Sequence, residues 1–214
     1  MFENRSIPRF DSQVWLESFR SDPNIFNELQ VITSKCDNQI SRGNIRYYAQ
    51  EAFNGSQKEL TRFFLATMIW GYNNDEENGV VNTRLSLNDT QLYPVLRNTI
   101  INIENQQVKV AYDDFKVKGC GPAFFTKIFY FIGDICKTKP LPLILDRNVA
   151  RFIHGICIEE GWNPDVFIKT SRNFYVKAYS EGYIRYINIM DSWAKMLCCN
   201  ADNIEYFMFQ EGRY

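Results

Sequence analysis

Histidine is almost absent from this chain of 214 residues, which contains only His154. The six cysteines are scattered apart from the adjacent pair Cys198 and Cys199, so neither a zinc-binding spacing nor the four-cysteine loop of an iron–sulfur cluster can be assembled. We therefore expect free, mostly buried thiols in a reducing compartment, no metal site and no cofactor. His154 lies near the apolar side of a helical pattern, and we interpret it as a hydrogen-bonded structural residue.

Long apolar runs are missing as well. No stretch approaches the roughly 18 to 20 residues that a helix needs to span a bilayer. The first residues, MFENRSIPRFDSQ, lack the hydrophobic centre of a signal peptide. We therefore expect a cytosolic protein that has no membrane partner.

An overall excess of charge is the third absence, because 24 basic residues face 25 acidic ones. This balance excludes an indiscriminate nucleic-acid coat protein but leaves room for a local basic patch. Residues 116–151 hold seven basic and two acidic side chains, a local charge of +5, which leaves −6 for the rest of a chain of net charge −1. A hydrophobic content of 45% argues against disorder and suffices for one large domain or two small lobes.

Helix signals dominate what is present. We expect helices to open at Asp22-Pro23, at a capping box from Ser56 to Glu59 and at Asn163-Pro164, and one helix to carry Pro94 in its first turn. Further helices are expected over 184–198 and after a second capping box at 202–205. The helix after Ser56 should end near Gly71. Residues 105–118 are predicted to be a connector with a short helical turn. Residues 72–79 are predicted to be a polar loop, and residues 80–87 (VVNTRLSL) a short strand or extended connection, in a protein that is otherwise all-α.

A glycine-flanked turn lies at the start of the basic segment. Gly119 and Gly121 tolerate positive φ on either side of a cysteine, and Pro122 suits the first turn of the helix that follows. Backbone N–H groups and the positive end of the helix dipole at such a turn can receive a phosphate, with Lys116 and Lys118 beside them. The alternative is an ordinary connection between two helices.

Lys127 stands out in the helix expected over 123–135, which is apolar or aromatic at almost every other position. A lysine on a buried helix must reach solvent, pair with another group or sit in a cavity. Desolvation would lower its pKa, and the resulting neutral amine is a nucleophile. The alternative is a lysine that extends to solvent or to a phosphate.

Asp146 follows a loop marked by Pro140 and Pro142 and directly precedes another helical pattern. An aspartate in this position commonly serves as an N-cap. A carboxylate held at a helix N-terminus is also fixed in place and could stabilise positive charge that develops on a sugar.

Taken together, these features resemble the helix-hairpin-helix DNA glycosylase superfamily, in particular its bacterial branch similar to 8-oxoguanine glycosylase. In that family a hairpin ending in a Gly-Thr-Lys-like run supplies the catalytic lysine, and an aspartate follows about 19 residues later. Here the run is Phe125-Thr126-Lys127, and Asp146 lies 19 residues after Lys127. Phe125 stands where the family often has glycine. The likeness extends over residues 55–214, through RFFLATMIWGY and the C-terminal helices, and leaves residues 1–50 unassigned.

The resemblance implies an all-α helix-hairpin-helix glycosylase fold, one unit over 1–214, with two helical lobes and an active-site cleft between them. It implies a monomer in the bacterial cytosol that acts on double-stranded DNA with a modified base and needs no metal or organic cofactor. Residues 116–151 would form the hairpin, the lysine helix and the aspartate loop. Contacts with DNA are expected from Lys116, Lys118, Gly119, Gly121, Phe125 and Arg147.

The reaction implied is extrusion of one nucleotide and cleavage of its N-glycosidic bond. Asp146 would stabilise the sugar, and Lys127 would form a Schiff base that gives additional strand nicking. Candidates for the base pocket are Trp70, Phe131, Asn148, Trp193, Tyr206, Phe207 and Phe209, although aromatic residues at helical spacing are commonly core.

Two alternatives to this reaction stay open. One is an enzyme that uses Asp146 alone and leaves an intact abasic site, and the other is a DNA-binding module without chemistry. The base could be an oxidised purine such as 8-oxoguanine, in base excision repair, or a bulky modified cytosine of phage DNA, in antiphage defence.

Overall fold

The computed structural model describes residues 7–72, 75–159, 167–169, 174–176 and 179–213. The chain divides into two compact units. Unit 1 consists of residues 1–100 and 116–121, and unit 2 of residues 101–115 and 122–214. The described residues are helical apart from one small hairpin, which confirms the all-α class. None of the described helices is long and apolar enough to cross a membrane.

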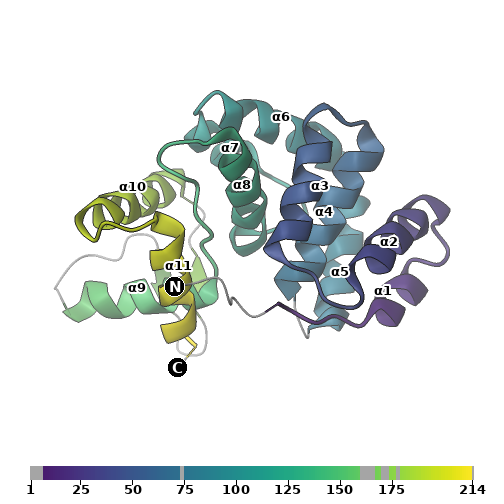
Figure 1. Cartoon of the computed structure of the whole chain (residues 1–214), viewed down its shortest axis with the longest axis horizontal. Helices are drawn as coiled ribbons and strands as arrows, with labels where there is room; N and C mark the ends of the chain where they lie inside the picture. Colours follow the sequence, from purple (N-terminus) through teal and green to yellow (C-terminus); the bar gives the residue numbers. More distant parts are fainter. Residues whose placement is uncertain (1–6, 73–74, 160–166, 170–173, 177–178, 214) are drawn as a thin grey trace. The chain divides into compact units, whose positions relative to one another are not determined.

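Unit 1 is built around the buried helix α4 (Figure 1), whose residues from Leu60 to Ile69 are inaccessible to solvent except Arg62. Helices α2, α3 and α5 pack against it, and α3 runs beside it over most of its length. The helices of this unit are α1 (Ser12–Ser18), α2 (Pro23–Cys36), α3 (Arg42–Asn54), α4 (Gln57–Tyr72), α5 (Glu76–Leu87) and most of α6 (Leu92–Glu104). Residues 7–50, which the sequence left unassigned, thus supply α1, α2 and most of α3.

The helix starts read from the sequence in this unit are confirmed. Asp22 accepts hydrogen bonds from the first turn of α2, where Pro23 occupies the first helical position. Glu59 accepts from the backbone N–H of Ser56 at 2.7 Å, and the Ser56 hydroxyl accepts from Lys58 N–H at 3.2 Å. These caps satisfy backbone donors that would otherwise lack a partner.

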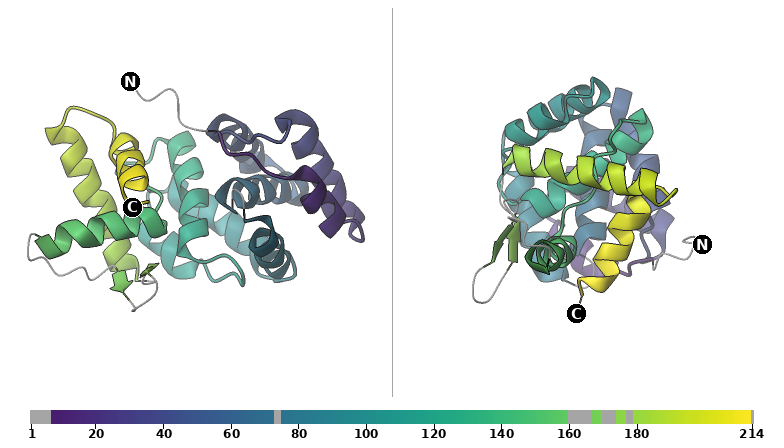
Figure 2. Two further views of the ribbon diagram at one scale, coloured as in Figure 1. Left: turned by 90° about the horizontal axis from the view of Figure 1, so that it is seen from below. Right: turned by 90° about the vertical axis from the view of Figure 1, so that its left-hand side faces the viewer.

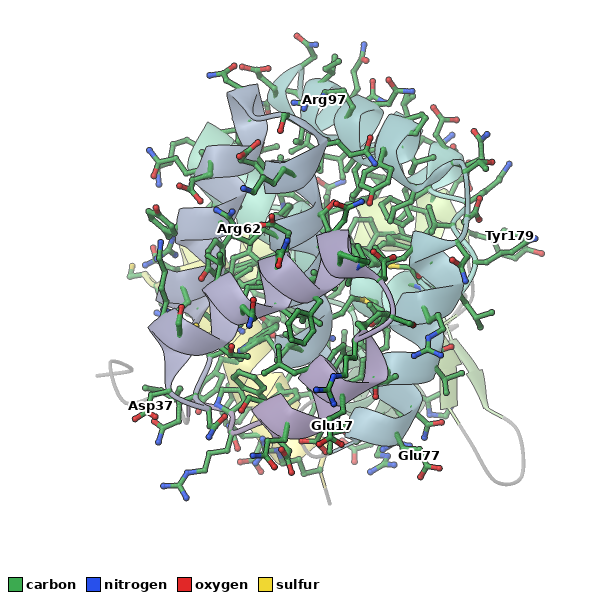
Figure 3. The ribbon with its side chains drawn as sticks, turned by 90° about the vertical axis from the view of Figure 1, so that its right-hand side faces the viewer. Glu17, Asp37, Arg62, Glu77, Arg97 and Tyr179 are labelled. Carbon is green, nitrogen blue, oxygen red and sulfur yellow. The ribbon has the colours of Figure 1, made fainter. Side chains whose placement is uncertain are left out.

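A buried ion pair links three helices of unit 1. Arg62 of α4 points toward α2 and α3 (Figure 3), with one guanidinium nitrogen 2.7 Å from Glu28 and another 3.2 Å from Glu51. Because Glu28 is buried and its other cation, Lys58 at 3.7 Å, is exposed, removal of Arg62 would leave the Glu28 charge only partly compensated, at a cost of at most about 3–5 kcal/mol.

The prediction for residues 80–87 is wrong, because they belong to helix α5 rather than to a strand or extended connection. The loop predicted over 72–79 is likewise shorter, since α5 begins at Glu76. The buried positions of α5 include Val80, Thr83 and Ser86, spaced at about one helical turn. Two of these three residues are polar, so the buried face carries little apolar periodicity. Two glutamates in its first turn also favour a helix N-terminus.

Unit 2 consists of the end of α6, α7 (Val108–Asp114), α8 (Pro122–Cys136), α9 (Arg147–Glu159), strands β1 (Phe167–Lys169) and β2 (Phe174–Val176), α10 (Ser180–Met196) and α11 (Ala201–Glu211). Helix α7 confirms the short helical turn predicted within 105–118. The two strands pair antiparallel, Phe167 opposite Val176, and β2 packs on α9 (Figure 2). A helix opening at Asn163-Pro164 is therefore wrong from Phe167 onward, where aromatic and β-branched residues favour strands; its start lies outside the described residues.

An aromatic cluster forms the core of unit 2 around Phe125. Its ring centroid lies 4.9 Å from that of Tyr112, 4.8 Å from that of Phe115 and 5.2 Å from that of Phe129. Tyr183 of α10 stacks on Tyr112 at 4.9 Å. Helix α8, buried from Phe125 to Gly133, is therefore rigidly held, and Lys127 lies within this buried stretch.

Candidate active site

The turn between α7 and α8 belongs to unit 1 and is fastened to α5 and the residues after it. The Ser86 hydroxyl donates to the Lys118 carbonyl at 2.7 Å, and Lys118 N–H donates to the Asp89 carboxylate at 3.0 Å. Val117 is buried, whereas the side chains of Lys116 and Lys118 are exposed. The turn therefore presents two cations to solvent on a fixed backbone.

The two glycines of this turn differ in what they do. Gly119 has φ of +77°, and a Cβ there would lie 2.3 Å from the carbonyl oxygen of Asn82, so only glycine fits. Gly121 does not share this positive φ, and no atom lies within 4 Å of where its Cβ would stand. Gly121 is exposed, so its missing side chain leaves the start of α8 open to an approaching ligand.

Lys127 is buried, with an exposed fraction of 6%, and it does not extend to solvent as a snorkelling lysine would. Its ammonium donates to the carbonyl of Ala123, one turn earlier, at 2.5 Å and lies 5.1 Å from the centroid of the Phe124 ring. Both of these contacts come from α8 itself. Lys127 is thus a desolvated nitrogen held near the start of a buried helix.

Asp146 is the N-cap of α9, as the sequence indicated. One carboxylate oxygen accepts hydrogen bonds from the backbone N–H groups of Asn148 and Val149, each at 3.0 Å. The side chain is half-buried, and its neighbour Arg147 is exposed. Both capping bonds are made by Oδ1. Capping therefore does not involve the second carboxylate oxygen, Oδ2.

A buried hydrogen bond joins the lysine helix to the aspartate loop next to both candidate residues. The Thr126 hydroxyl accepts from the backbone N–H of Leu145 at 3.1 Å while donating to the Pro122 carbonyl at 2.7 Å. Thr126 precedes Lys127, and Leu145 precedes Asp146. The two candidate catalytic residues are therefore each one residue away from the same buried contact.

The loop over residues 137–146, which we call the Asp146 loop, is held at several further points. Lys139 N–H donates to the Gln106 side chain at 3.1 Å. Pro142 packs so closely on Gly133 of α8 that a Cβ there would lie 2.4 Å from the proline ring. The hydroxyls of Tyr183 and Tyr186 donate to the carbonyls of Leu143 and Ile144, each at 2.8 Å. These tyrosines were not predicted as site residues, although buried phenols at a spacing of three on one helix each require a hydrogen-bond partner.

Helix α11 faces the side of α8 that carries Lys127. Tyr130, one turn after Lys127, donates to the Asp202 carboxylate at 3.3 Å. The capping box predicted at 202–205 is wrong, because Asn200 is the N-cap of α11 and Asp202 lies in its first turn. Glu205, also missed as a site residue, is buried with an exposed fraction of 1%.

Two of the remaining site candidates are core residues. Phe125, predicted to contact DNA, has an exposed fraction of 4% and belongs to the aromatic cluster, so the structure removes it from the surface of the turn. Phe131 is fully buried next to Tyr130. Asn148 remains half-buried in the first turn of α9.

The aromatic pocket candidates are spread over both units. Trp70 belongs to unit 1, where the Arg42 guanidinium lies 5.3 Å from its ring. Trp193 is half-buried on α10. Phe207 of α11 is 50% exposed and contacts Phe152 edge-on, while Tyr206 and Phe209 stack on each other with ring centroids 6.5 Å apart. Among these pocket candidates, only Phe207 has a largely exposed ring.

Metal-binding side chains do not gather in the part of the chain that the structure describes: no group of three or more His, Cys, Asp and Glu residues there could hold an ion. His154 is buried, in keeping with a structural role.

Comparison with known proteins identifies one family. The family model described as "Putative 8-oxoguanine DNA glycosylase OGG-like protein" matches residues 4–209. No curated protein and no solved structure matches the chain. The match covers nearly all of both units, including the turn, the lysine helix and the Asp146 loop. The chain therefore belongs to this OGG-like family.

Proposed function

We propose that this protein is a DNA glycosylase that extrudes a modified base from duplex DNA and cleaves its N-glycosidic bond with Asp146 and Lys127. The observation that carries the proposal is the hydrogen bond from Leu145 to Thr126, which fixes the residues next to both groups against each other. Membership of a glycosylase family supplies DNA as the partner. The exposed Lys116, Lys118 and Arg147 are the proposed phosphate contacts.

In the proposed reaction the bond between the sugar C1′ and the base breaks, and the base leaves with the electron pair. The Asp146 carboxylate stabilises the positive charge that develops on the sugar. The Lys127 ammonium gives one proton to the departing base, and the neutral amine forms a bond to C1′. The C1′–O4′ bond then breaks, its electron pair and a second proton from the nitrogen go to O4′, and a Schiff base forms between Lys127 and C1′. Loss of a proton from C2′ to water and departure of the 3′ phosphate with the electrons of its bond to C3′ then nick the strand.

Borohydride trapping tests this proposal. The protein is incubated with duplexes containing 8-oxoguanine or glucosylated hydroxymethylcytosine, and a covalent adduct is expected that Lys127→Ala abolishes. Lys137→Ala is the matched control, because Lys137 is an exposed lysine that directly follows the same helix. Adduct that persists in Lys127→Ala removes Lys127 from the nucleophile role.

Asp146→Asn separates chemistry from capping, because asparagine caps a helix as well as aspartate does. We expect this variant to retain its fold and lose most of its excision rate. If Lys127→Ala still excises base while Asp146→Asn does not, the enzyme uses the aspartate alone. DNA binding without excision in the wild type, left unchanged by Asp146→Asn, would instead favour a DNA-binding module. Preference for 8-oxoguanine would place the enzyme in base excision repair, and preference for the glucosylated base in antiphage defence.

A further inference from the structure

Three consecutive residues of the Asp146 loop have a backbone group bonded by a side-chain hydroxyl. Tyr183 donates to the Leu143 carbonyl at 2.8 Å, Tyr186 donates to the Ile144 carbonyl at 2.8 Å, and the Leu145 N–H donates to Thr126 at 3.1 Å. All of these residues are buried. Loops ordinarily bond their backbone to water at the surface, so three buried hydroxyls in a row are an unusual restraint.

The restraint ends at Asp146. Tyr183 and Tyr186 lie one turn apart on α10, whereas Thr126 lies on α8, so the loop is gripped from two helices. The last residue bonded in this way, Leu145, is the one before Asp146. Asp146 follows Ile144 by two residues, so a displacement of the Ile144 carbonyl also displaces the Asp146 carboxylate.

The tyrosine hydroxyls are permanent donors. Burial raises the pKa of Tyr186 well above its ordinary value, and the carboxylates of Glu205 and, to a smaller extent, Asp146 raise it further. Burial has the same effect on the pKa of Tyr183.

We propose that Tyr186, supported by Tyr183, is a positioning residue that sets the Asp146 carboxylate for cleavage of the glycosidic bond. This inference rests on the proposed function and extends it to residues that touch neither DNA nor the reacting atoms. The physical reason is that electrostatic stabilisation of the sugar depends on the distance to a fixed carboxylate. Misplacement of a catalytic group by about 1 Å costs on the order of 100-fold in rate.

The test compares two buried tyrosines of the same aromatic cluster. Tyr186→Phe removes the hydroxyl on Ile144 and keeps the ring. Tyr112→Phe is the matched control, because the buried Tyr112 hydroxyl has no hydrogen-bond partner among the described residues. Single-turnover excision is measured on the two duplexes named above, and DNA affinity by fluorescence anisotropy.

We expect Tyr186→Phe to slow excision roughly 10- to 100-fold with unchanged DNA affinity, and Tyr112→Phe to match the wild type. In the Asp146→Asn background Tyr186→Phe should cause no further loss, because it acts through Asp146. Equal rates for the two tyrosine variants, or a loss that adds to that of Asp146→Asn, overturn the inference. Tyr183→Phe repeats the test at the neighbouring bond if Tyr186→Phe does not fold.

Amide hydrogen exchange of residues 137–149 gives a reading that needs no activity. A wild-type protein that excises neither base overturns the proposed function, and exchange then decides the positioning role by itself. Faster exchange in Tyr186→Phe but not in Tyr112→Phe keeps the tyrosine as the group that fixes Asp146. Equal exchange in the two variants removes it.

Discussion

Replacement of Thr126 by valine tests the contact that joins the lysine helix to the Asp146 loop. Valine keeps the shape of the side chain but leaves the buried N–H of Leu145 without its acceptor. An orphaned buried donor costs about 1–3 kcal/mol. With a urea dependence of about 2 kcal/mol per molar, a loss of 2 kcal/mol lowers the unfolding midpoint by about 1 M.

Thr67 provides a closely matched control. It is fully buried on a buried helix and donates to the carbonyl four residues earlier, at 2.9 Å, just as Thr126 does at 2.7 Å. No bond from a distant backbone N–H to Thr67 is recorded in the described residues, so Thr67→Val loses only the local bond. The amount by which Thr126→Val lowers the free energy of unfolding more than Thr67→Val does therefore measures the contact with Leu145.

The assay is urea unfolding followed by circular dichroism, with amide hydrogen exchange assigning each loss to the unit that holds the substitution. Thr126→Ser retains the hydroxyl and should recover most of the stability lost in Thr126→Val. Equal losses in Thr126→Val and Thr67→Val would refute the reasoning, because the contact with Leu145 would then contribute nothing measurable.

Two further predictions concern the turn and the thiols. Gly119→Ala should lower the free energy of unfolding by about 1–3 kcal/mol, because alanine is strained at positive φ and has no room there. Gly121→Ala should leave that free energy unchanged while weakening DNA binding in anisotropy titrations; unchanged binding would separate Gly121 from the DNA contact. Burial raises the pKa of Cys136 to about 11, so at pH 8 iodoacetamide should modify the exposed Cys198 and Cys199 first, as mass spectrometry can determine. Faster modification of Cys136 would contradict its burial.

The sequence predicts the parts of the fold that local chemistry decides. Asp22 precedes a proline, and Ser56 lies three residues before a glutamate. Each starts a helix through hydrogen bonds made within four residues of chain. The almost continuous apolar run around Lys127 indicates a buried helix, because it is also a pattern within one short stretch of sequence. Asp146 could be placed at the start of α9 because capping is a local interaction too.

Features that depend on distant residues could not be read in this way. Helix α5 buries Thr83 and Ser86, whose polar side chains conceal the helical period. Asp202 bonds to Tyr130, 72 residues away, instead of capping its own helix. The hydrogen bonds from α10 to the Asp146 loop join residues 40 or more apart. Their acceptors are backbone carbonyls, so the residue types in the loop give no sign of them.

The hydrogen bonds that hold the Asp146 loop limit which insertions and deletions the loop can accept. Tyr183, Tyr186 and Thr126 bond three successive residues in a fixed register. One residue inserted or deleted between Cys136 and Leu143 would have to be absorbed before the first of these bonds, and one inserted after it would shift Asp146 out of place. The register therefore fixes the stretch from Leu143 to Asp146, and change within it is confined to substitution at constant length.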